Sequence, residues 1–338
     1  MAGVLAPTGP AYPHEATVCG FGQSNELLAS QSDGPAGLIN GLRAAGGPSL
    51  AETLTYAANG SALLEAFAGA VGFWLATDGS DGTHLTAAKA MCAAMPRRSL
   101  SGVWTQGEQE SVGGFATDAH RIAYRDGLIS VLGSLRSAMN PADANAVTMY
   151  VHPLGRRTSN ASASVALGCN LVRQAHCEAI ASTTWIAFAG EYYDLPLRDD
   201  VHLTHAGFRR MKARLADVVA AQYNGSHTPV LGPLIASATR QGPRAVDVPV
   251  TVEAGQSLIT PGRPAHFGVY ASDGKRIDVT GGTWTGSTVR LALAADLGSG
   301  GTLRYPDGAL YDWVTPDNVV RYAGADRPLR STVPVAIG

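Results

Sequence analysis

The stretch Cys19-Gly20-Phe21-Gly22-Gln23-Ser24-Asn25-Glu26 joins a short apolar run to a segment that has the character of a helix start. The preceding residues 16–19, Ala-Thr-Val-Cys, are typical of a buried strand. The following residues 26–29, Glu-Leu-Leu-Ala, favour a helix. A serine at a strand-to-helix turn can present its hydroxyl beyond the edge of the sheet, beside the first N–H groups of the helix. Ser24 is therefore a candidate nucleophile, although capping is the commoner role for a serine at a helix start.

Length and composition define the broad class of protein. The chain of 338 residues is too long for one ordinary domain and suits two. A hydrophobic fraction of 45% is ample for packed cores, which argues against a disordered or fibrous chain. The net charge of −2 and the lack of Lys/Arg clusters longer than pairs argue against a nucleic-acid partner. No apolar run is long enough to cross a bilayer.

The expected compartment follows from the N-terminus and the cysteines. Residues 1–14 have neither the basic n-region nor the apolar h-region of a signal peptide. The cysteines lack metal-ligand spacing and are expected to be reduced, buried thiols; they are Cys19, Cys92, Cys169 and Cys177. No His, Cys and Asp cluster indicates a metal, and no cofactor is expected. We expect a cytoplasmic protein, with the periplasm or secretion left open if a leader has been removed.

Up to about residue 228, short apolar runs alternate with longer helical stretches. The predicted strands are 16–21, 53–57, 101–105, 145–151 and 184–189. The predicted helices are 62–69, 85–95, 118–139, 161–182 and 204–222. This alternation favours a five-stranded parallel sheet covered by helices on both faces. Such sheets bind ligands beyond the carboxyl ends of their strands, where Ser24 would lie.

From residue 229 the chain consists of short alternating runs separated by Gly, Pro and Asp turns, as in 245–252, 265–270 and 288–293. No helix is predicted in this part. Its length of about 110 residues suits a small antiparallel β-sandwich. We therefore predict an α/β domain over 1–228 and a β-sandwich accessory domain over 229–338.

A base for Ser24 is predicted in the segment Asp-Asp-Val-His-Leu-Thr at 199–204, between the fifth strand and the last helix. A carboxylate three residues before a histidine can hold the imidazole in one tautomer and stabilise the imidazolium. Asp199 has that spacing to His202, and the adjacent Asp200 remains an alternative.

A second segment, 81–86, has the same D-x-x-H-L-T pattern. It lies in the long connection between the second and third predicted strands, whereas His202 follows the last strand. We favour His202 as the base on this topological ground. His84 is then expected to line the substrate cleft.

Oxyanion donors are predicted at the ends of the neighbouring strands. Gln106 follows the third strand, and a side-chain amide there can donate to a developing oxyanion. Gly60 follows the second strand, where a glycine lets its backbone N–H approach a ligand closely. The N–H of Ser24 itself would be the third donor. Glu108, also after the third strand, is expected either to contact a sugar hydroxyl or, in preference, to stabilise the loop.

Four blocks together resemble a known family: Gly22-Gln23-Ser24-Asn25, Asn59-Gly60-Ser61, Trp104-Thr105-Gln106-Gly107-Glu108 and Asp199-x-x-His202. In this order they resemble the sialate O-acetylesterase and acetylxylan esterase branch of the SGNH hydrolases. The resemblance extends to about residue 225. The segments 300–305 and 318–324 are similar to the last strands of the β-domain that closes sialate O-acetylesterases.

The resemblance implies a three-layer α/β/α SGNH domain of flavodoxin-like type. It implies that Ser24 is the nucleophile, His202 the base and Asp199 its orienting carboxylate, with Gly60 and Gln106 as oxyanion donors. This chain departs from the common pattern in two places. Glu26 stands where an apolar residue is frequent. Asn59 stands where the family often has the first glycine of a pair.

The resemblance also implies an activity, the removal of O-acetyl groups from a carbohydrate or polysaccharide. Trp74 and Trp104 are expected to be available for stacking on sugar. Two alternatives are kept: a lipase or thioesterase on the same fold, and a non-catalytic polysaccharide-binding or assembly protein on an SGNH scaffold. The oligomeric state is left open.

Overall fold

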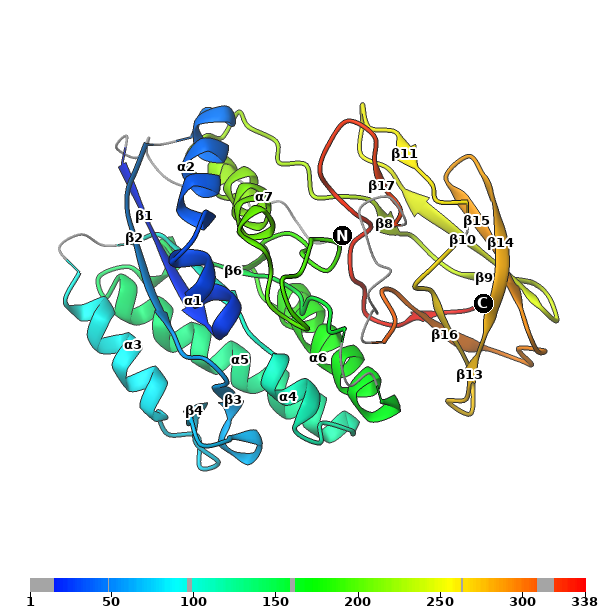
Figure 1. Ribbon diagram of the computed structural model, residues 1–338, viewed down its shortest axis with the longest axis horizontal. Coiled ribbons are helices and arrows are strands. Elements are labelled where there is room, and N and C mark those ends of the chain that lie inside the picture. Colours follow the sequence, from blue (N-terminus) through cyan, green and yellow to red (C-terminus); the bar gives the residue numbers. More distant parts are fainter. Residues whose placement is uncertain (1–14, 48, 96–98, 159–161, 263, 309–318) are drawn as a thin grey trace.

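The computed structural model describes residues 15–338, except 48, 96–98, 159–161, 263 and 309–318. Figure 1 shows an α/β part, coloured blue to green, beside a β-rich part, coloured yellow to red. The helices of the α/β part are α1 (Ser24–Ser30), α2 (Gly34–Ala44), α3 (Thr83–Ala93), α4 (Glu108–Val112), α5 (Asp118–Met139), α6 (Ala163–Ser182) and α7 (His205–Tyr223).

The α/β part is built on one parallel sheet of five strands in the order β2-β1-β5-β6-β7. Its strands are β1 (Glu15–Gly22), β2 (Ser49–Ala57), β5 (Ser101–Thr105), β6 (Thr148–Val151) and β7 (Ile186–Phe188). In the register, Gly22 is level with Ala57 on one side and with Thr105 on the other. The turns that follow these three strands therefore meet at one edge of the sheet.

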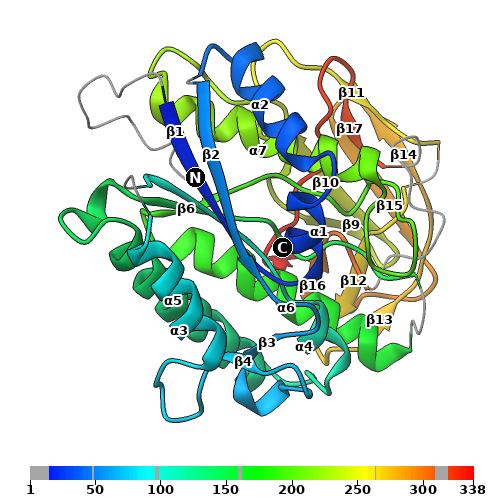
Figure 2. The ribbon, with the colours of Figure 1, turned by 60° about the vertical axis from the view of Figure 1, so that its left-hand side comes forward.

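Helices cover both faces of this sheet, as Figure 2 shows. Val18 and Val103 point to the face packed by α2 and α7. Cys19 and Trp104, one residue further along their strands, point to the opposite face and its larger core with α3, α5 and α6. This alternation is the two-residue period of a strand buried on both sides. The predicted three-layer α/β/α arrangement with a five-stranded parallel sheet is confirmed.

Most of the predicted elements are confirmed. All five predicted strands form the sheet, although residues 144–146 are a 3-10 turn that precedes β6. The helices predicted at 85–95, 118–139, 161–182 and 204–222 are α3, α5, α6 and α7, with residue 161 outside the described residues. Helix α7 is capped by Thr204, whose hydroxyl accepts a hydrogen bond from the Gly207 N–H at 3.1 Å.

The helix predicted at 62–69 is wrong. The apolar run there forms a short parallel pair, β3 (Ala62–Leu64) with β4 (Phe73–Leu75), with a 3-10 turn (Glu65–Phe67) between the two strands. A run this short is not long enough to show whether its apolar residues follow the period of a helix or of a strand.

Two short helices were not predicted, α2 and α4. Helix α2 contains three glycines, which disfavour a helix in isolation. Two of them allow close packing on α7. A Cβ at Gly37 would lie 2.1 Å from the Arg209 carbonyl, and one at Gly41 would lie 2.6 Å from the Ala216 Cβ. Tertiary packing, which sequence propensity does not report, stabilises this helix.

The β-rich part consists of two antiparallel sheets packed on one core. The first has the order β14-β15-β10-β8, with β9 also pairing with β10, and the second the order β13-β12-β16-β18. The strands are β8 (Leu234–Ile235), β9 (Thr239–Gly242), β10 (Ala245–Thr251), β11 (Leu258–Ile259), β12 (Gly268–Ala271), β13 (Arg276–Ile277), β14 (Val279–Thr285), β15 (Thr288–Leu293), β16 (Gly301–Arg304), β17 (Arg321–Tyr322) and β18 (Val335–Ala336). Strands β11 and β17 form a separate pair. This arrangement agrees with the predicted β-sandwich.

The predicted domain boundary near residue 228 falls between α7 and β8. Of the two C-terminal segments that resemble sialate O-acetylesterases, 300–305 contains β16 and 318–324 contains β17, with residue 318 outside the described residues. Among the described residues, no helix has the length and hydropathy of a membrane span.

Candidate active site

The turn between β1 and α1 presents Ser24 at the edge of the sheet. Gly22 has φ +134°, and a Cβ on it would lie 2.1 Å from the Thr105 carbonyl oxygen, so only glycine fits there. The Gln23 N–H donates to that same carbonyl at 2.9 Å, which ties the turn to β5. Gln23 occupies the N-cap position of α1, and Ser24 is the first helical residue. The capping role considered for Ser24 is therefore wrong.

Ser24, His202 and Asp199 form a hydrogen-bonded chain. The Nδ1 of His202 lies 2.9 Å from both carboxylate oxygens of Asp199. Because a carboxylate accepts, Nδ1 carries the proton, and Nε2 is left as an acceptor. The Ser24 Oγ lies 2.9 Å from that Nε2. The histidine is thus oriented to receive the serine proton, in the order of groups found in hydrolase triads.

Asp199 is held in an ionised state by its own loop. Desolvation opposes ionisation, but hydrogen bonds from the backbone N–H groups of His202 and Val201 and from the His202 ring outweigh it. Together they lower the pKa of Asp199 to about 2. The adjacent Asp200 turns away and lies 3.6 Å from the Arg157 guanidinium. Of the two carboxylates left open by the sequence, Asp199 is the one that contacts the histidine.

The second D-x-x-H segment does not form a comparable pair. Asp81 binds Lys89 at 2.6 Å. The Nε2 of His84 donates to the Val71 carbonyl at 3.0 Å, and its Nδ1 accepts from the Tyr56 hydroxyl at 3.1 Å. Burial also lowers the pKa of His84. With both ring nitrogens engaged, His84 is a structural residue at the start of α3, and the cleft-lining role predicted for it is not supported.

Glu108 connects the turn that carries Ser24 to the loop that carries His202 through Asn25. The Asn25 amide donates to Glu108 Oε1 at 2.7 Å and to the Val201 carbonyl at 3.1 Å. The Tyr192 hydroxyl also donates to Glu108 Oε1, at 3.2 Å. Glu108 is 7% exposed. Of the two roles expected for it, the structure favours loop stabilisation over contact with a sugar.

Gln23 is a residue whose role the sequence reasoning missed. Its side-chain oxygen accepts hydrogen bonds from the backbone N–H groups of Gly107 at 3.2 Å and Gln109 at 3.4 Å. The amide therefore bridges the turn after β1 to the turn after β5. The two predicted blocks are in this way joined by hydrogen bonds as well as by strand register.

The oxyanion-donor role predicted for the Gln106 side chain is wrong. Its amide group donates to the Ser61 carbonyl at 3.2 Å and to the Glu110 carboxylate at 2.9 Å, and its oxygen accepts from the Tyr124 hydroxyl at 2.7 Å. Burial raises the pKa of Glu110 to about 7, against the hydrogen bonds that it accepts. Both amide hydrogens of Gln106 are thus occupied in a buried network, which the sequence block alone does not reveal.

The Asn59-Gly60 turn lies next to the turn that carries Ser24. The Ala58 N–H donates to the Gly22 carbonyl at 3.1 Å. Gly60 has φ +70°, and the Ser61 carbonyl is held by Gln106. Gln106 therefore supports this turn, which carries the predicted Gly60 donor. Ser24, as the first residue of α1, has an N–H with no acceptor inside the helix.

The sugar-stacking role predicted for Trp74 and Trp104 is wrong. Both side chains are fully buried in the core under the sheet. Their rings contact each other edge to face, with centroids 4.8 Å apart. They cannot present a ring face to a ligand and instead fill the core behind the site.

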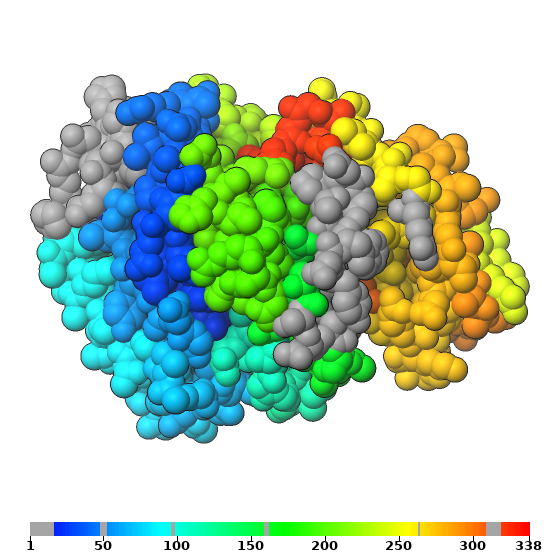
Figure 3. All heavy atoms as spheres, viewed as in Figure 1, coloured from blue at the N-terminus to red at the C-terminus, as the bar shows by residue number. Residues whose placement is uncertain are grey.

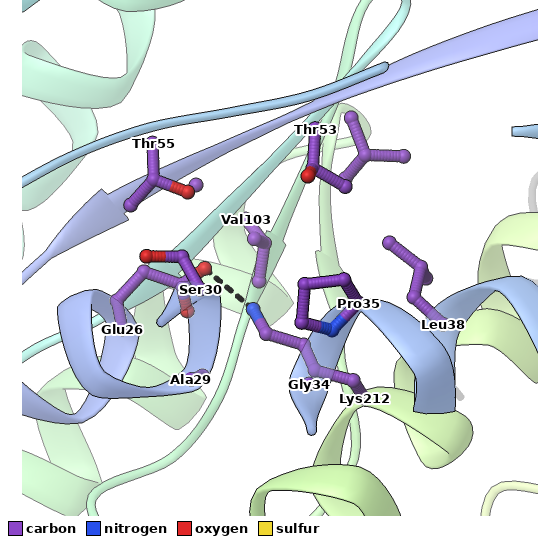
Figure 4. Close-up of a pocket in the computed structure, with 12 residues that line it drawn as sticks. Glu26, Ala29, Ser30, Gly34, Pro35, Leu38, Thr53, Thr55, Val103 and Lys212 are labelled. Carbon is purple, nitrogen blue, oxygen red and sulfur yellow. Dashed lines mark hydrogen bonds and ion pairs between the residues drawn. The ribbon is translucent and has the colours of Figure 1, made fainter. Parts of the chain in front are cut away.

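Glu26, the residue that departs from the family pattern, has a buried partner on α7. Its carboxylate lies 2.5 Å from the Lys212 ammonium and accepts a hydrogen bond from the Thr105 hydroxyl at 2.8 Å. Figure 4 shows this pair in a pocket between the sheet and the helices, beside Thr53, Thr55 and Val103. Ser24 and His202 do not line this pocket. It backs helix α1 and is separate from the serine–histidine pair.

Known proteins similar to this chain are found by comparing structures and not by comparing sequences. No family model matches the sequence, and no curated protein matches it. A carbohydrate acetylesterase from Xanthomonas citri has a TM-score of 0.66 at 16% identity, with 95% of this chain and 80% of that chain covered. A carbohydrate acetylesterase from Sinorhizobium meliloti has a TM-score of 0.42 at 14% identity, covering 61% of this chain and 99% of that chain.

The first of these likenesses establishes the fold. It covers nearly the whole chain, so it includes the β-sandwich as well as the α/β part. The resemblance to SGNH hydrolases expected from the four sequence blocks is confirmed at the level of the fold. The chain thus has a three-layer α/β/α domain followed by a C-terminal β-sandwich, as in that solved structure.

Proposed function

We propose that this protein is a serine esterase that removes O-acetyl groups from a carbohydrate or polysaccharide. One observation carries the proposal: the Ser24 Oγ lies 2.9 Å from a histidine nitrogen whose ring partner is a carboxylate at 2.9 Å. A serine in this arrangement is activated for attack on a carbonyl carbon.

The reaction proceeds by acyl transfer. His202 accepts the Ser24 proton as Oγ attacks the acetyl carbonyl, and Asp199 stabilises the imidazolium that forms. The N–H groups of Ser24 and Gly60 stabilise the oxyanion. As the bond between the acetyl carbon and the sugar oxygen breaks, His202 gives its proton to that oxygen, and the acetyl group stays on Ser24. A water molecule, deprotonated by His202, releases acetate and restores the Ser24 hydroxyl.

The acetylated carbohydrate is proposed on two grounds. The four sequence blocks resemble carbohydrate O-acetylesterases, and the solved structure with a TM-score of 0.66 is described as a carbohydrate acetylesterase. The test is acetate release from acetylated sialic acid, xylan, cellulose and chitin oligomers, with Ser24→Ala as the control. We expect release from at least one of them by the wild type only. Binding of a polymer without acetate release would favour the non-catalytic alternative, and preference for long acyl esters would favour a lipase or thioesterase.

Replacing each of the two neighbouring aspartates separately by asparagine distinguishes their roles. Asp199→Asn removes the charge that orients His202, and kcat for p-nitrophenyl acetate should fall by about 10²–10⁴-fold. Asp200→Asn leaves the carboxylate that contacts His202 in place and should keep kcat within about threefold of the wild type, since the Asp200 oxygen lies 3.6 Å from Arg157 in a partly exposed pair that contributes little. Steady-state kinetics on the two purified variants check this. A larger loss in Asp200→Asn would mean that the carboxylate is assigned incorrectly.

A further inference from the structure

The loop of residues 189–204, between β7 and α7, carries Asp199 and His202. Its distal part is closed on itself: the Arg198 N–H donates to the His202 carbonyl at 2.8 Å, and the Thr204 N–H donates to the Pro196 carbonyl at 3.0 Å. Figure 3 shows this loop, in green, against the blue segment around α1. The distal part is tied to the Ser24 turn by Asn25, which bonds the Val201 carbonyl and the Leu203 N–H. The preceding residues 190–195 are its second anchor.

Glu191 and Tyr193 of this second anchor are held by the β-sandwich, whereas the Tyr192 hydroxyl and the Leu195 carbonyl bond to groups of the α/β part. The Glu191 carboxylate accepts hydrogen bonds from the Ser331 backbone N–H at 2.6 Å and from the Ser331 hydroxyl at 3.0 Å. The Tyr193 hydroxyl donates to the Leu329 carbonyl at 2.7 Å and lies 3.2 Å from the Tyr305 hydroxyl. Tyr193 is fully buried and belongs to the core of the β-sandwich, although it comes from the α/β part of the chain.

A third connection passes through helix α7. The Arg214 guanidinium binds both carboxylate oxygens of Asp194, at 2.6 and 2.7 Å, and Asp326 of the β-sandwich at 2.8 Å. Arg210 binds the same Asp326 carboxylate at 2.9 Å through its Nε. Arg214 and Asp194 are each 1% exposed. Charged groups this deeply buried keep their geometry only when each has its partner.

We propose that the β-sandwich positions the catalytic histidine: residues 326–331 hold the stretch 190–195 and thereby set the distance from His202 to Ser24. The inference rests on the proposed function for its catalytic consequence. Without the Asp326 carboxylate and the Ser331 hydroxyl, Arg214 loses one partner and Glu191 keeps only the Ser331 N–H, so this anchor of the loop is weakened. A displacement of about 1 Å at a catalytic group can cost on the order of 10²-fold in rate.

The test uses full-length protein and two changes within the β-sandwich, Asp326→Ala and Ser331→Ala combined. We expect kcat for p-nitrophenyl acetate to fall by at least about tenfold while KM changes by less than about threefold, since alignment is lost but the substrate site is not. Hydrogen exchange of peptides from 190–204 should become at least about tenfold faster. The conservative pair Asp326→Glu and Ser331→Thr, which keeps the hydrogen-bonding groups, should recover most of kcat.

The matched control is Asp247→Ala, which breaks a bidentate pair with Arg290 inside the β-sandwich. It should change neither kcat nor exchange in 190–204. A folded double variant with wild-type kcat and wild-type exchange, or an equal loss in Asp247→Ala, would overturn the proposal. If the double variant does not fold, Asp326→Asn is judged by the same two readouts. If exchange in 190–204 is faster in the double variant but the wild type hydrolyses p-nitrophenyl acetate no faster than Ser24→Ala, the proposed function is rejected. The anchoring of the loop by the β-sandwich is then retained.

Discussion

His202→Ala should lower kcat for p-nitrophenyl acetate by about 10⁴-fold or more, the scale of loss when a triad histidine is removed. The reason is geometric. His202 Nε2 lies 2.9 Å from the Ser24 Oγ, and its other nitrogen is occupied by Asp199. Without the imidazole the serine hydroxyl has no base and remains a weak nucleophile at neutral pH. Initial rates, measured on variants shown to be folded by circular dichroism, give the result.

The control for this prediction is His84→Ala, taken from the segment with the same D-x-x-H-L-T pattern. His84 is engaged by Val71 and Tyr56, and Asp81 is engaged by Lys89. Loss of the His84 side chain should lower the free energy of unfolding but leave kcat within about tenfold of the wild type, because core substitutions act mainly on folding. Full activity in His202→Ala would show that His202 is not the general base.

Lys212→Met should destabilise the fold by about 3–5 kcal/mol, the cost of leaving a buried charge without its partner. The partner is Glu26, which is 2% exposed and would retain the Thr105 hydroxyl. Urea denaturation, followed by tryptophan fluorescence, measures the change in the free energy of unfolding. The exposed pair of Arg209 with Asp33 is the control, and Arg209→Met should cost less than about 1 kcal/mol.

A double-mutant cycle tests the cause of that loss. Combining Lys212→Met with Glu26→Gln removes both charges, so the double variant should be at least about 1 kcal/mol more stable than Lys212→Met alone. Additive losses in the two single variants would show that packing, and not an uncompensated charge, accounts for the effect.

The predictable part of the site was the part that strand topology determines. The turns after β1, β2 and β5 meet at one edge because parallel strands end together, so Ser24, Gly60 and Gln106 could be grouped from sequence. The choice of His202 over His84 rested on the same topology and agrees with the hydrogen bonds that the two histidines make.

The remainder depends on contacts between residues far apart in the chain. Glu26 looked like a departure from the family pattern because its partner Lys212 is 186 residues away. Gln106 looked like an oxyanion donor because nothing in its block predicts that Glu110 and Ser61 occupy its amide. Short-range patterns predict elements and edges, whereas the orientation of a buried side chain depends on the whole core.

The most direct test of the central claim is labelling with a fluorophosphonate, which reacts when an activated serine oxygen displaces fluoride from phosphorus. Intact mass spectrometry followed by peptide mapping locates the adduct. We expect a single adduct on Ser24, absent in Ser24→Ala and formed much more slowly in His202→Ala, since the probe reports activation of the nucleophile independently of any sugar substrate. No adduct on the folded wild type, or an adduct mapped to another serine, would contradict it.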